Sequence, residues 1–272
     1  MSNRNLRVLP PILRGKHHGA ASAFTPENLL REARRQKGLP DTPVPEVCIL
    51  DPDGDVVRYL RATGRAQRVE SWVCYHSDMD RFTQGGREYG IVGCAVGASY
   101  AVLLAEQMFA SGCRLVVSIT SSGQITALRL PPYFILIERA LRDEGTSYHY
   151  LPASDYAEAD PALVATISAA LAHVGEPVER GATWTTDAPY RETPEAIAAA
   201  REAGILAVEM EAAALYAFAQ ARSKPVLCFA HVTNQMGQAG DFEKGEANGA
   251  IASLVLVQVV AEAWLQSPFG SA

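Results

Sequence analysis

Short apolar segments alternate with helical segments from residue 46 onward, and this alternation constrains the fold more than any other feature of the sequence. Strands are predicted at residues 47–50, 68–75, 89–96, 114–119, 178–185, 205–208 and 225–232. Helices are predicted at residues 56–62, 99–111, 161–173, 194–203, 212–221 and 246–266. Such a chain is expected to form a single α/β domain of three layers, with a mixed, mostly parallel central sheet and helices on both faces.

The first 45 residues are predicted to form an arm with one helix. Thr25 is a favourable N-cap, Pro26 suits the first helical position, and Gly38 ends the helix. Residues 39–45 contain three prolines and form a stiff linker. An arm of this size cannot bury a core of its own, so it packs either on its own domain or on a neighbouring subunit. We therefore divide the chain into the arm, residues 1–45, and an α/β domain, residues 46–268.

Composition and charge exclude several classes of protein. Of the 272 residues, 48% are hydrophobic and 20% are charged, which is ordinary for a globular protein. The net charge of −6 does not favour a nucleic-acid partner. No apolar run reaches the roughly 18 residues needed to span a bilayer, and the start lacks the apolar stretch of a signal peptide. A cytoplasmic protein without a membrane partner is expected.

The cysteine and histidine patterns predict neither disulfides nor a metal site. None of the five cysteines forms a C-x-x-C pair, and most have apolar neighbours, so we interpret them as buried thiols in a reducing compartment. The six histidines lack the spacing of metal ligands. The adjacent His17 and His18 are typical of a solvated turn.

Polar and glycine residues follow the predicted strands, where α/β folds bind their ligands. The segments concerned are Asp51–Asp55, Gly97–Ser99, Thr120–Gly123, Thr186–Asp187, Glu209–Glu211 and Thr233–Asn234. In the fifth segment, Glu209 and Glu211 flank Met210 at the start of a helix rich in alanine. Negatively charged side chains are stabilised at the positive end of a helix dipole, and this is one explanation for two carboxylates at this position. The other is that an ionised carboxylate accepts hydrogen bonds from two neighbouring hydroxyl groups, such as those of a ribose.

At this point the sequence resembles a known family. Val208-Glu-Met-Glu-Ala-Ala-Ala-Leu-Tyr216 closely resembles the V-E-M-E-A-A-x-x-Y segment of nucleoside phosphorylases and related nucleosidases. Residues 93–106, 117–125, 185–190 and 232–235 resemble further motifs of that family in the same order along the chain. The resemblance covers roughly residues 46–265 and implies a homo-oligomer, between a dimer and a hexamer, that acts on a small nucleoside-like molecule.

The resemblance also implies roles for particular residues. Glu211 would hold the 2′ and 3′ hydroxyl groups of a ribose, and Met210 would flank the sugar and the base. The remaining predicted substrate-binding residues lie at the strand ends: Gly97, Ser121, Ser122, Gly123, Tyr190 and Glu209. No metal and no cofactor is expected, with inorganic phosphate as a possible co-substrate.

The sequence departs from the family where phosphorylases bind phosphate. Their G-D-P-x-R loop corresponds to Leu50-Asp-Pro-Asp-Gly-Asp55, which lacks the arginine and carries extra carboxylates. The arginine of the family's R-V-G turn is also absent, although Arg58, Arg81 or Arg87 could replace it from elsewhere. Family hydrolases lack these arginines and use a carboxylate to activate water. We therefore predict hydrolysis slightly ahead of phosphorolysis, with Asp55 or Asp53 as the general base; a turn without catalytic function remains the alternative for this loop.

The residues near the base leave further alternatives. Purine-specific members use an Asp to protonate the leaving base, whereas this chain has Asn234, whose amide donates hydrogen bonds but supplies no proton. This favours a pyrimidine or a non-standard base. Asp187 is a candidate catalytic residue and equally a candidate for capping its own turn. A repurposed fold that binds or transforms another small molecule is the competing hypothesis for the whole chain.

Overall fold

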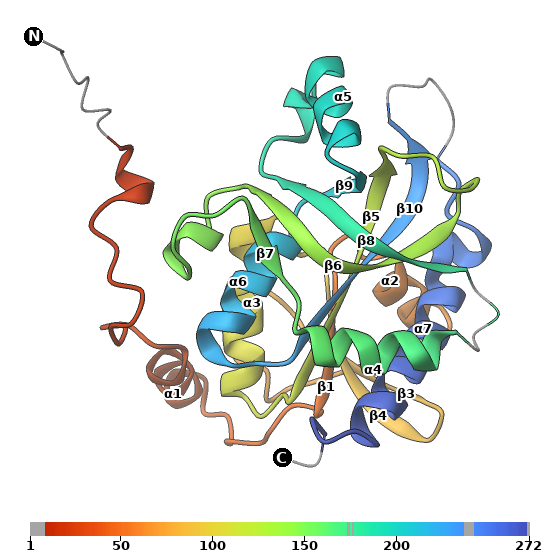
Figure 1. Cartoon of the computed structure of the whole chain (residues 1–272). Helices are drawn as coiled ribbons and strands as arrows, with labels where there is room; N and C mark the ends of the chain where they lie inside the picture. The colour runs from red at the N-terminus through yellow and green to blue at the C-terminus, as the bar shows by residue number, and fades with distance from the viewer. Residues whose placement is uncertain (1–8, 173–174, 176, 237–241, 271–272) are drawn as a thin grey trace, which may run out of the picture.

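The computed structural model of the chain describes residues 9–172, 175, 177–236 and 242–270 (Figure 1). Its centre is a sheet with the strand order β10-β6-β8-β9-β5-β1-β4-β3-β2, to which β7 adds beside β6. The strands are β1 (Val47–Asp51), β2 (Gln67–Arg68), β3 (Asp80–Gln84), β4 (Arg87–Gly93), β5 (Leu115–Gln124), β6 (Tyr133–Asp143), β7 (Tyr156–Glu158), β8 (Val178–Thr186), β9 (Ile205–Glu209) and β10 (Val226–Gln235).

Helices cover the sheet from two sides (Figure 1). The α-helices are α1 (Pro26–Lys37), α2 (Asp55–Ala62), α3 (Ala98–Ala110), α4 (Pro161–Leu171), α5 (Pro194–Glu202), α6 (Ala212–Arg222) and α7 (Ala250–Leu265). The shorter 3-10 helices are η1 (Pro11–Leu13), η2 (Ser147–His149), η3 (Pro189–Arg191) and η4 (Glu246–Gly249). α3 contacts α6 and α1 on one side, and α7 contacts α4 and α2 on the other. The predicted α/β fold with a mixed sheet is confirmed.

Part of the sheet closes on itself, which the sequence does not predict. β5 pairs with β1, with β9 and with β10, and β10 also pairs with β6. The ring consists of β5, β10, β6, β8 and β9, each paired with the next, and β9 pairs with β5 to close it. Register shifts lie between Val232 and Asn234 in β10 and between Ile137 and Arg139 in β6. Irregularities of this kind bend strands and increase their twist, which allows the ring to close.

The structure differs from the prediction in three places. Instead of a strand at residues 68–75, only Gln67–Arg68 is extended, and the chain then turns. The polar segment that follows forms the β3–β4 hairpin, because Gly85 and Gly86 adopt left-handed backbone angles at its tip. Neither β6 nor β7 was predicted, although Tyr133-Phe-Ile-Leu-Ile137 is a typical buried strand.

The last helix is long and apolar enough to cross a membrane by length and composition, contrary to the expectation that no segment reaches this length. Half of the apolar window in Glu246–Leu265 is buried, as is usual for a core helix. Leu254, Val257 and Trp264 belong to the core. The α-helix also begins later than predicted, at Ala250, because Ala247 and Asn248 have left-handed backbone angles.

The arm contains the predicted helix and packs on its own domain. Thr25 accepts a hydrogen bond from Asn28 N at 3.3 Å, and Gly38 ends α1 in the left-handed conformation. Leu30 packs near Val73, and His18 Nε2 lies 3.2 Å from Tyr148 O. Residues 1–8 of the predicted arm, and His173 at the end of a predicted helix, lie outside the described residues.

The cysteines are free thiols, but they are not all buried as predicted. Cys48, Cys74, Cys113 and Cys228 are buried, whereas Cys94 is exposed. Cys94 follows β4 with φ of 59°, a left-handed conformation that carries its side chain out of the sheet.

Candidate active site

The carboxyl ends of several strands lie together at one end of the sheet, as predicted. Two hydrogen bonds from backbone N–H groups to carboxylate side chains connect the segments that follow them. Ser121 N donates to Asp53 Oδ2 at 2.7 Å, which joins β5 to the loop after β1. Gly97 N donates to Glu211 Oε1 at 2.7 Å, which joins the start of α3 to the start of α6. β5 and β10 run further than predicted, so residues 120–123 and 233–234 lie within strands. The sheet therefore brings together residues that are far apart in the sequence.

Glu211 is buried at this junction, with one carboxylate oxygen unpaired. Its relative exposure is 1%, and Oε2 has no hydrogen-bond partner among the described residues. Burial raises the pKa of Glu211 to about 8, and the negative charge of Glu209 acts in the same direction. The Gly97 amide opposes this increase by stabilising the ionised form. Glu211 therefore offers a buried carboxyl group that can still form hydrogen bonds with a bound molecule.

Glu209 differs from Glu211, because its carboxylate is fully engaged. Oε2 accepts hydrogen bonds from Glu211 N and Ala212 N, each at 2.7 Å, and Oε1 accepts from the hydroxyl groups of Thr183 and Thr185. These contacts satisfy free N–H groups at the start of α6. Glu209 was predicted to bind substrate, but its contacts are those of a buried helix cap.

The loop after β1 is organised by Asp51. Its carboxylate accepts hydrogen bonds from Gly54 N at 3.1 Å and from Val57 N at 2.9 Å. Burial raises the pKa of Asp51 to about 7, and the charges of Asp53 and Asp55 act in the same direction. Gly54 has φ of 77° and precedes α2, so the turn needs glycine at this position.

Asp55 lies between two cations. Arg58 Nη2 contacts its Oδ1 at 2.8 Å, and Lys244 Nζ contacts its Oδ2 at 2.6 Å. Although burial opposes the change, the hydrogen bonds from Lys244 and Arg58 lower the pKa of Asp55. A carboxylate held in this way is a weak proton acceptor, so Asp53 is the better of the two predicted bases. Lys244 was missed from the sequence, because nothing near residue 244 indicates a contact with the first loop.

Ser121, Ser122 and Thr120 lie on β5 beside these carboxyl groups. Because side chains alternate along a strand, Thr120 and Ser122 share one face and Ser121 lies on the other. Thr120 lowers the pKa of Glu211 and so identifies this face as the one near Glu211. The hydroxyl group of Ser122 is buried and unpaired among the described residues. Ser122 is thus the predicted serine best placed to act beside Glu211.

Residues predicted to lie near the base gather on adjacent strands. Asn234 pairs in register with Gly123, and Gly123 pairs with Val208, two residues before Met210. Met236 covers Gly123 so closely that a Cβ atom there would lie 2.1 Å from its Sδ. Asn234 Nδ2 is 3.9 Å from the same sulfur. A Cβ atom at residue 123 would therefore require the Met236 side chain to shift.

His231 is a second residue that the sequence analysis missed. It pairs in register with Ser121, and its ring stacks on Phe134 with a centroid distance of 4.7 Å. Burial lowers the pKa of His231 to about 4, and the positive charge of Lys244 contributes. The imidazole is therefore neutral at physiological pH.

Asp187 and Tyr190 lie on the segment that follows β8. Asp187 Oδ2 accepts a hydrogen bond from Gly145 N at 2.8 Å and so fixes the loop after β8 to the turn after β6. These contacts support the structural alternative for Asp187. Tyr190 is 99% exposed on η3 and does not reach the carboxyl groups around Glu211 within the chain.

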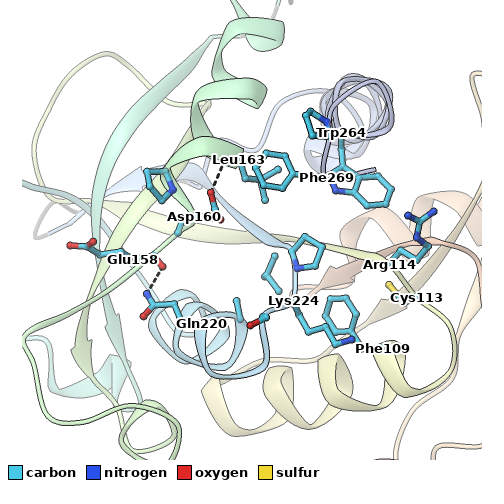
Figure 2. A pocket seen from close by; sticks show the side chains of 17 residues that line it. Phe109, Cys113, Arg114, Glu158, Asp160, Leu163, Gln220, Lys224, Trp264 and Phe269 are labelled. Carbon is cyan, nitrogen blue, oxygen red and sulfur yellow. Dashed lines mark hydrogen bonds between the residues drawn. The ribbon is translucent and has the colours of Figure 1, made fainter. Parts of the chain in front are cut away.

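A cavity of about 840 Å³ lies away from these residues, at the opposite end of the strands (Figure 2). Phe109 and Trp264 line it together with Lys224 and Asp160, near the beginnings of β5 and β10. None of the predicted site residues lines this cavity, so we do not assign the active site to it. Within the described ranges, no group of three or more His, Cys, Asp or Glu side chains is placed to hold a metal ion.

Comparison with known proteins identifies relatives over most of the chain. The family model described as the phosphorylase superfamily matches residues 46–263. A uridine phosphorylase of Thermococcus kodakarensis is 26% identical over 238 residues, covering 77% of this chain and 84% of the relative. A DeoD-type purine nucleoside phosphorylase of Colwellia psychrerythraea is 27% identical over 156 residues, covering 57% of this chain and 67% of the relative.

Solved structures have the same fold. A uridine phosphorylase of Vibrio fischeri in complex with 6-hydroxy-1-naphthoic acid has a TM-score of 0.68 at 19% identity, covering 84% of this chain and 95% of that chain. A second structure of the Vibrio fischeri enzyme has a TM-score of 0.66 at 20% identity, covering 83% of this chain and 93% of that chain. At these identities the likeness concerns the fold alone.

Proposed function

The chain belongs to the phosphorylase superfamily, and from this premise we propose that it cleaves the N-glycosidic bond of a nucleoside-like riboside with water as the acceptor. The prediction of an enzyme of this superfamily is confirmed. The choice of water and the identity of the base are our proposals and rest on the arrangement of Glu211, Asp53, Asp55 and Asn234.

The observation that carries the proposal is the state of Glu211. One of its oxygens is fixed by Gly97 N, whereas the other is buried without a partner among the described residues. A buried polar atom of this kind is costly unless a ligand completes its hydrogen bonds. A carboxyl group with a pKa of about 8 is protonated at neutral pH, so it donates to one hydroxyl group and accepts from another. A vicinal diol such as that of ribose satisfies both requirements.

Asp53 is the proposed base for the attacking water. Ser121 N orients its Oδ2, and Asp53 is close enough to Glu211 for its charge to raise the pKa of that residue. In the proposed step, the water oxygen forms a bond to the anomeric carbon as the C1′–N bond breaks. The water proton passes to Asp53, and the electron pair of the broken bond leaves on the base. The first loop thus supplies the base that accepts the proton of the attacking water.

Asn234 is the proposed partner of the leaving base. Its amide donates a hydrogen bond that stabilises negative charge on the base, although it transfers no proton. This arrangement favours a base that can carry the charge after departure, which a pyrimidine such as uracil does through its carbonyl oxygens. We therefore propose a pyrimidine riboside as the substrate class.

Phosphorolysis is the second candidate, because the named relatives are phosphorylases and because Arg58 and Lys244 supply positive charge at the first loop. The decisive experiment incubates the protein with purine and pyrimidine ribosides, with and without inorganic phosphate. NMR of the products separates free sugar from sugar 1-phosphate. Free sugar formed without phosphate is expected. Strict dependence on phosphate would contradict hydrolysis.

A variant of Glu211 tests the recognition of the diol. Glu211→Ala is expected to lower kcat/KM for the ribosides by about 100-fold, or roughly 2.7 kcal/mol, because the two hydrogen bonds to the diol are lost. The matched substrate is the 2′-deoxyriboside, for which the variant should lose much less. Equal losses on both substrates would exclude diol binding. Unchanged turnover of every active riboside would instead favour a repurposed fold.

A further inference from the structure

Two cations of this chain hold a carboxylate of the same chain between them. Arg58 Nη2 and Lys244 Nζ each contact a different oxygen of Asp55, at 2.8 and 2.6 Å. The Asp55 side chain is 13% exposed, and that of Lys244 is 24% exposed. Lys244 and Asp55 are 189 positions apart in sequence, so the contact exists only in the folded chain. The Arg58 side chain is 58% exposed, so the Lys244–Asp55 pair is the better shielded of the two and the less weakened by solvent.

Arg58 is held in place by contacts other than the one to Asp55. Its Nη2 also donates to Asp53 O at 2.6 Å, and Nη1 lies 3.8 Å from Cys94 Sγ. Lys244 precedes a segment in which Gly245, Ala247, Asn248 and Gly249 all have positive φ. Backbone conformations of this kind are costly for residues other than glycine and are found mainly where the surrounding structure enforces them. The Arg58 charge is therefore positioned partly independently of the carboxylate, and the backbone that follows Lys244 is constrained by its surroundings.

The helix adds to the attraction for an anion. Asp55 is the first residue of α2, whose N-terminus carries a partial positive charge, although Asp51 already accepts hydrogen bonds from Gly54 N and Val57 N there. Two cations and a helix N-terminus together satisfy the requirements for holding a tetrahedral oxyanion. The carboxylates of Asp53 and Asp51 lie in the same loop. Their negative charge opposes the binding of an anion in addition to Asp55.

We propose that Arg58 and Lys244 form an oxyanion site that the protein fills with its own Asp55 carboxylate, and that Asp55 thereby selects water over phosphate as the acceptor. The selection of water over phosphate rests on the proposed function, whereas the existence of the anion site does not. With Asp55 removed, phosphate takes the position of the carboxylate. A phosphate oxygen then forms the bond to the anomeric carbon as the C1′–N bond breaks, and the electron pair leaves on the base.

The test measures the binding of inorganic phosphate by calorimetry at constant ionic strength. It compares the wild type with Asp55→Ala, Asp55→Asn, Lys244→Ala and the double variant Asp55→Ala/Lys244→Ala. Asp55→Ala removes both the charge and the side chain, whereas Asp55→Asn removes only the charge and keeps the position filled. Asp41→Asn is the control, since Asp41 is an exposed partner of Arg34 at 3.2 Å in the arm. Thermal unfolding of each variant verifies that it is folded.

Asp55→Ala is expected to bind phosphate at least about tenfold more tightly than the wild type, because each charge-assisted contact contributes roughly that factor. The double variant should lose this gain, Asp55→Asn should show less of it, and Asp41→Asn should show none. Equal binding by Asp55→Ala and the wild type would overturn the proposal. Strong phosphate binding by the wild type that Lys244→Ala abolishes would also overturn it, because Asp55 would then not exclude the anion.

A second measurement follows the reaction products in the presence of phosphate. Asp55→Ala should form sugar 1-phosphate from a riboside for which the wild type forms free sugar. If no riboside is cleaved by any variant, the proposed function fails, while the calorimetric result still decides the anion site. If the wild type hydrolyses ribosides but Asp55→Ala gains no phosphate binding, only the present inference fails.

Discussion

Gly97 N donates a hydrogen bond of 2.7 Å to Glu211 Oε1, although the two residues are 114 positions apart in sequence. The bond joins the start of α3 to the start of α6 and fixes one oxygen of the buried carboxyl group. The other oxygen is buried without a partner among the described residues. Under the proposed function, this oxygen binds the substrate diol.

Gly97→Ala should weaken both stability and activity. Gly97 has φ of 98° and ψ of 146°, a conformation that L side chains rarely adopt, while a Cβ atom there would meet no atom within 4 Å. The cost is therefore backbone strain and not a clash. We expect a loss of about 1–3 kcal/mol in the free energy of unfolding, together with a lower kcat/KM as Gly97 N moves away from Glu211. Urea unfolding and steady-state kinetics measure the two effects.

Gly64→Ala is the matched control for this variant. Gly64 has φ of 67° in an exposed turn, and a Cβ atom there would also meet no atom within 4 Å. This variant should lose stability without losing activity. If Gly64→Ala and Gly97→Ala changed kcat/KM equally, the special role of Gly97 would be refuted.

Glu209→Gln should reduce stability more than substrate binding. The carboxylate of Glu209 accepts hydrogen bonds from two backbone N–H groups and two hydroxyl groups. A glutamine would direct its own NH₂ group at some of these donors and leave at least one buried group unpaired. We expect the free energy of unfolding to fall by about 1–3 kcal/mol, with KM of the folded enzyme nearly unchanged. A raised KM at wild-type stability would instead support the original assignment of Glu209 to the substrate.

Stability should fall as the pH rises from about 5 to 8. Burial raises the pKa of Glu211 from an ordinary value of 4.5 to about 8, and that of Asp51 from 3.8 to about 7. Between these values the folded chain holds protons that the unfolded chain has released. The free energy of unfolding therefore decreases with pH, by up to about 1.4 kcal/mol per pH unit for each group.

Glu211→Gln tests this explanation, because glutamine does not titrate. Relative to the wild type, the variant should become progressively more stable from pH 5 to pH 8. Guanidinium unfolding at several pH values measures the difference. A constant difference across this range would show that Glu211 does not hold a proton in the folded protein.

Tyr216→Phe should destabilise the fold through the helix that follows Glu211. The buried hydroxyl group of Tyr216 donates to Ile137 O and accepts from Cys228 N at 3.1 Å. Phenylalanine removes one hydrogen bond from each of these backbone groups, at an expected loss of about 1–3 kcal/mol in the free energy of unfolding. The control is Tyr190→Phe, since Tyr190 is 99% exposed and should tolerate the change. Equal stability of both variants would contradict the prediction.

The sequence by itself determined the α/β class, the helix from Pro26 to Lys37 and the position of Glu211 at the start of a helix. These features depend on local patterns: apolar periodicity, capping residues and a contiguous motif. For the same reason, the segment Val208–Tyr216 was sufficient to indicate the family to which the chain belongs.

Only the tertiary structure decided how the contacts of Glu209 differ from those of Glu211, and which aspartate of the first loop lies between two cations. Glu209 meets Thr183 and Thr185 because β8 pairs with β9, and Asp55 meets Lys244 because the segment before α7 packs over the first loop. Both contacts join residues distant in sequence, through side-chain hydrogen bonds that leave no local periodicity. The closure of the sheet through β5 and β10 has the same origin, since it depends on register shifts that strand propensity does not encode.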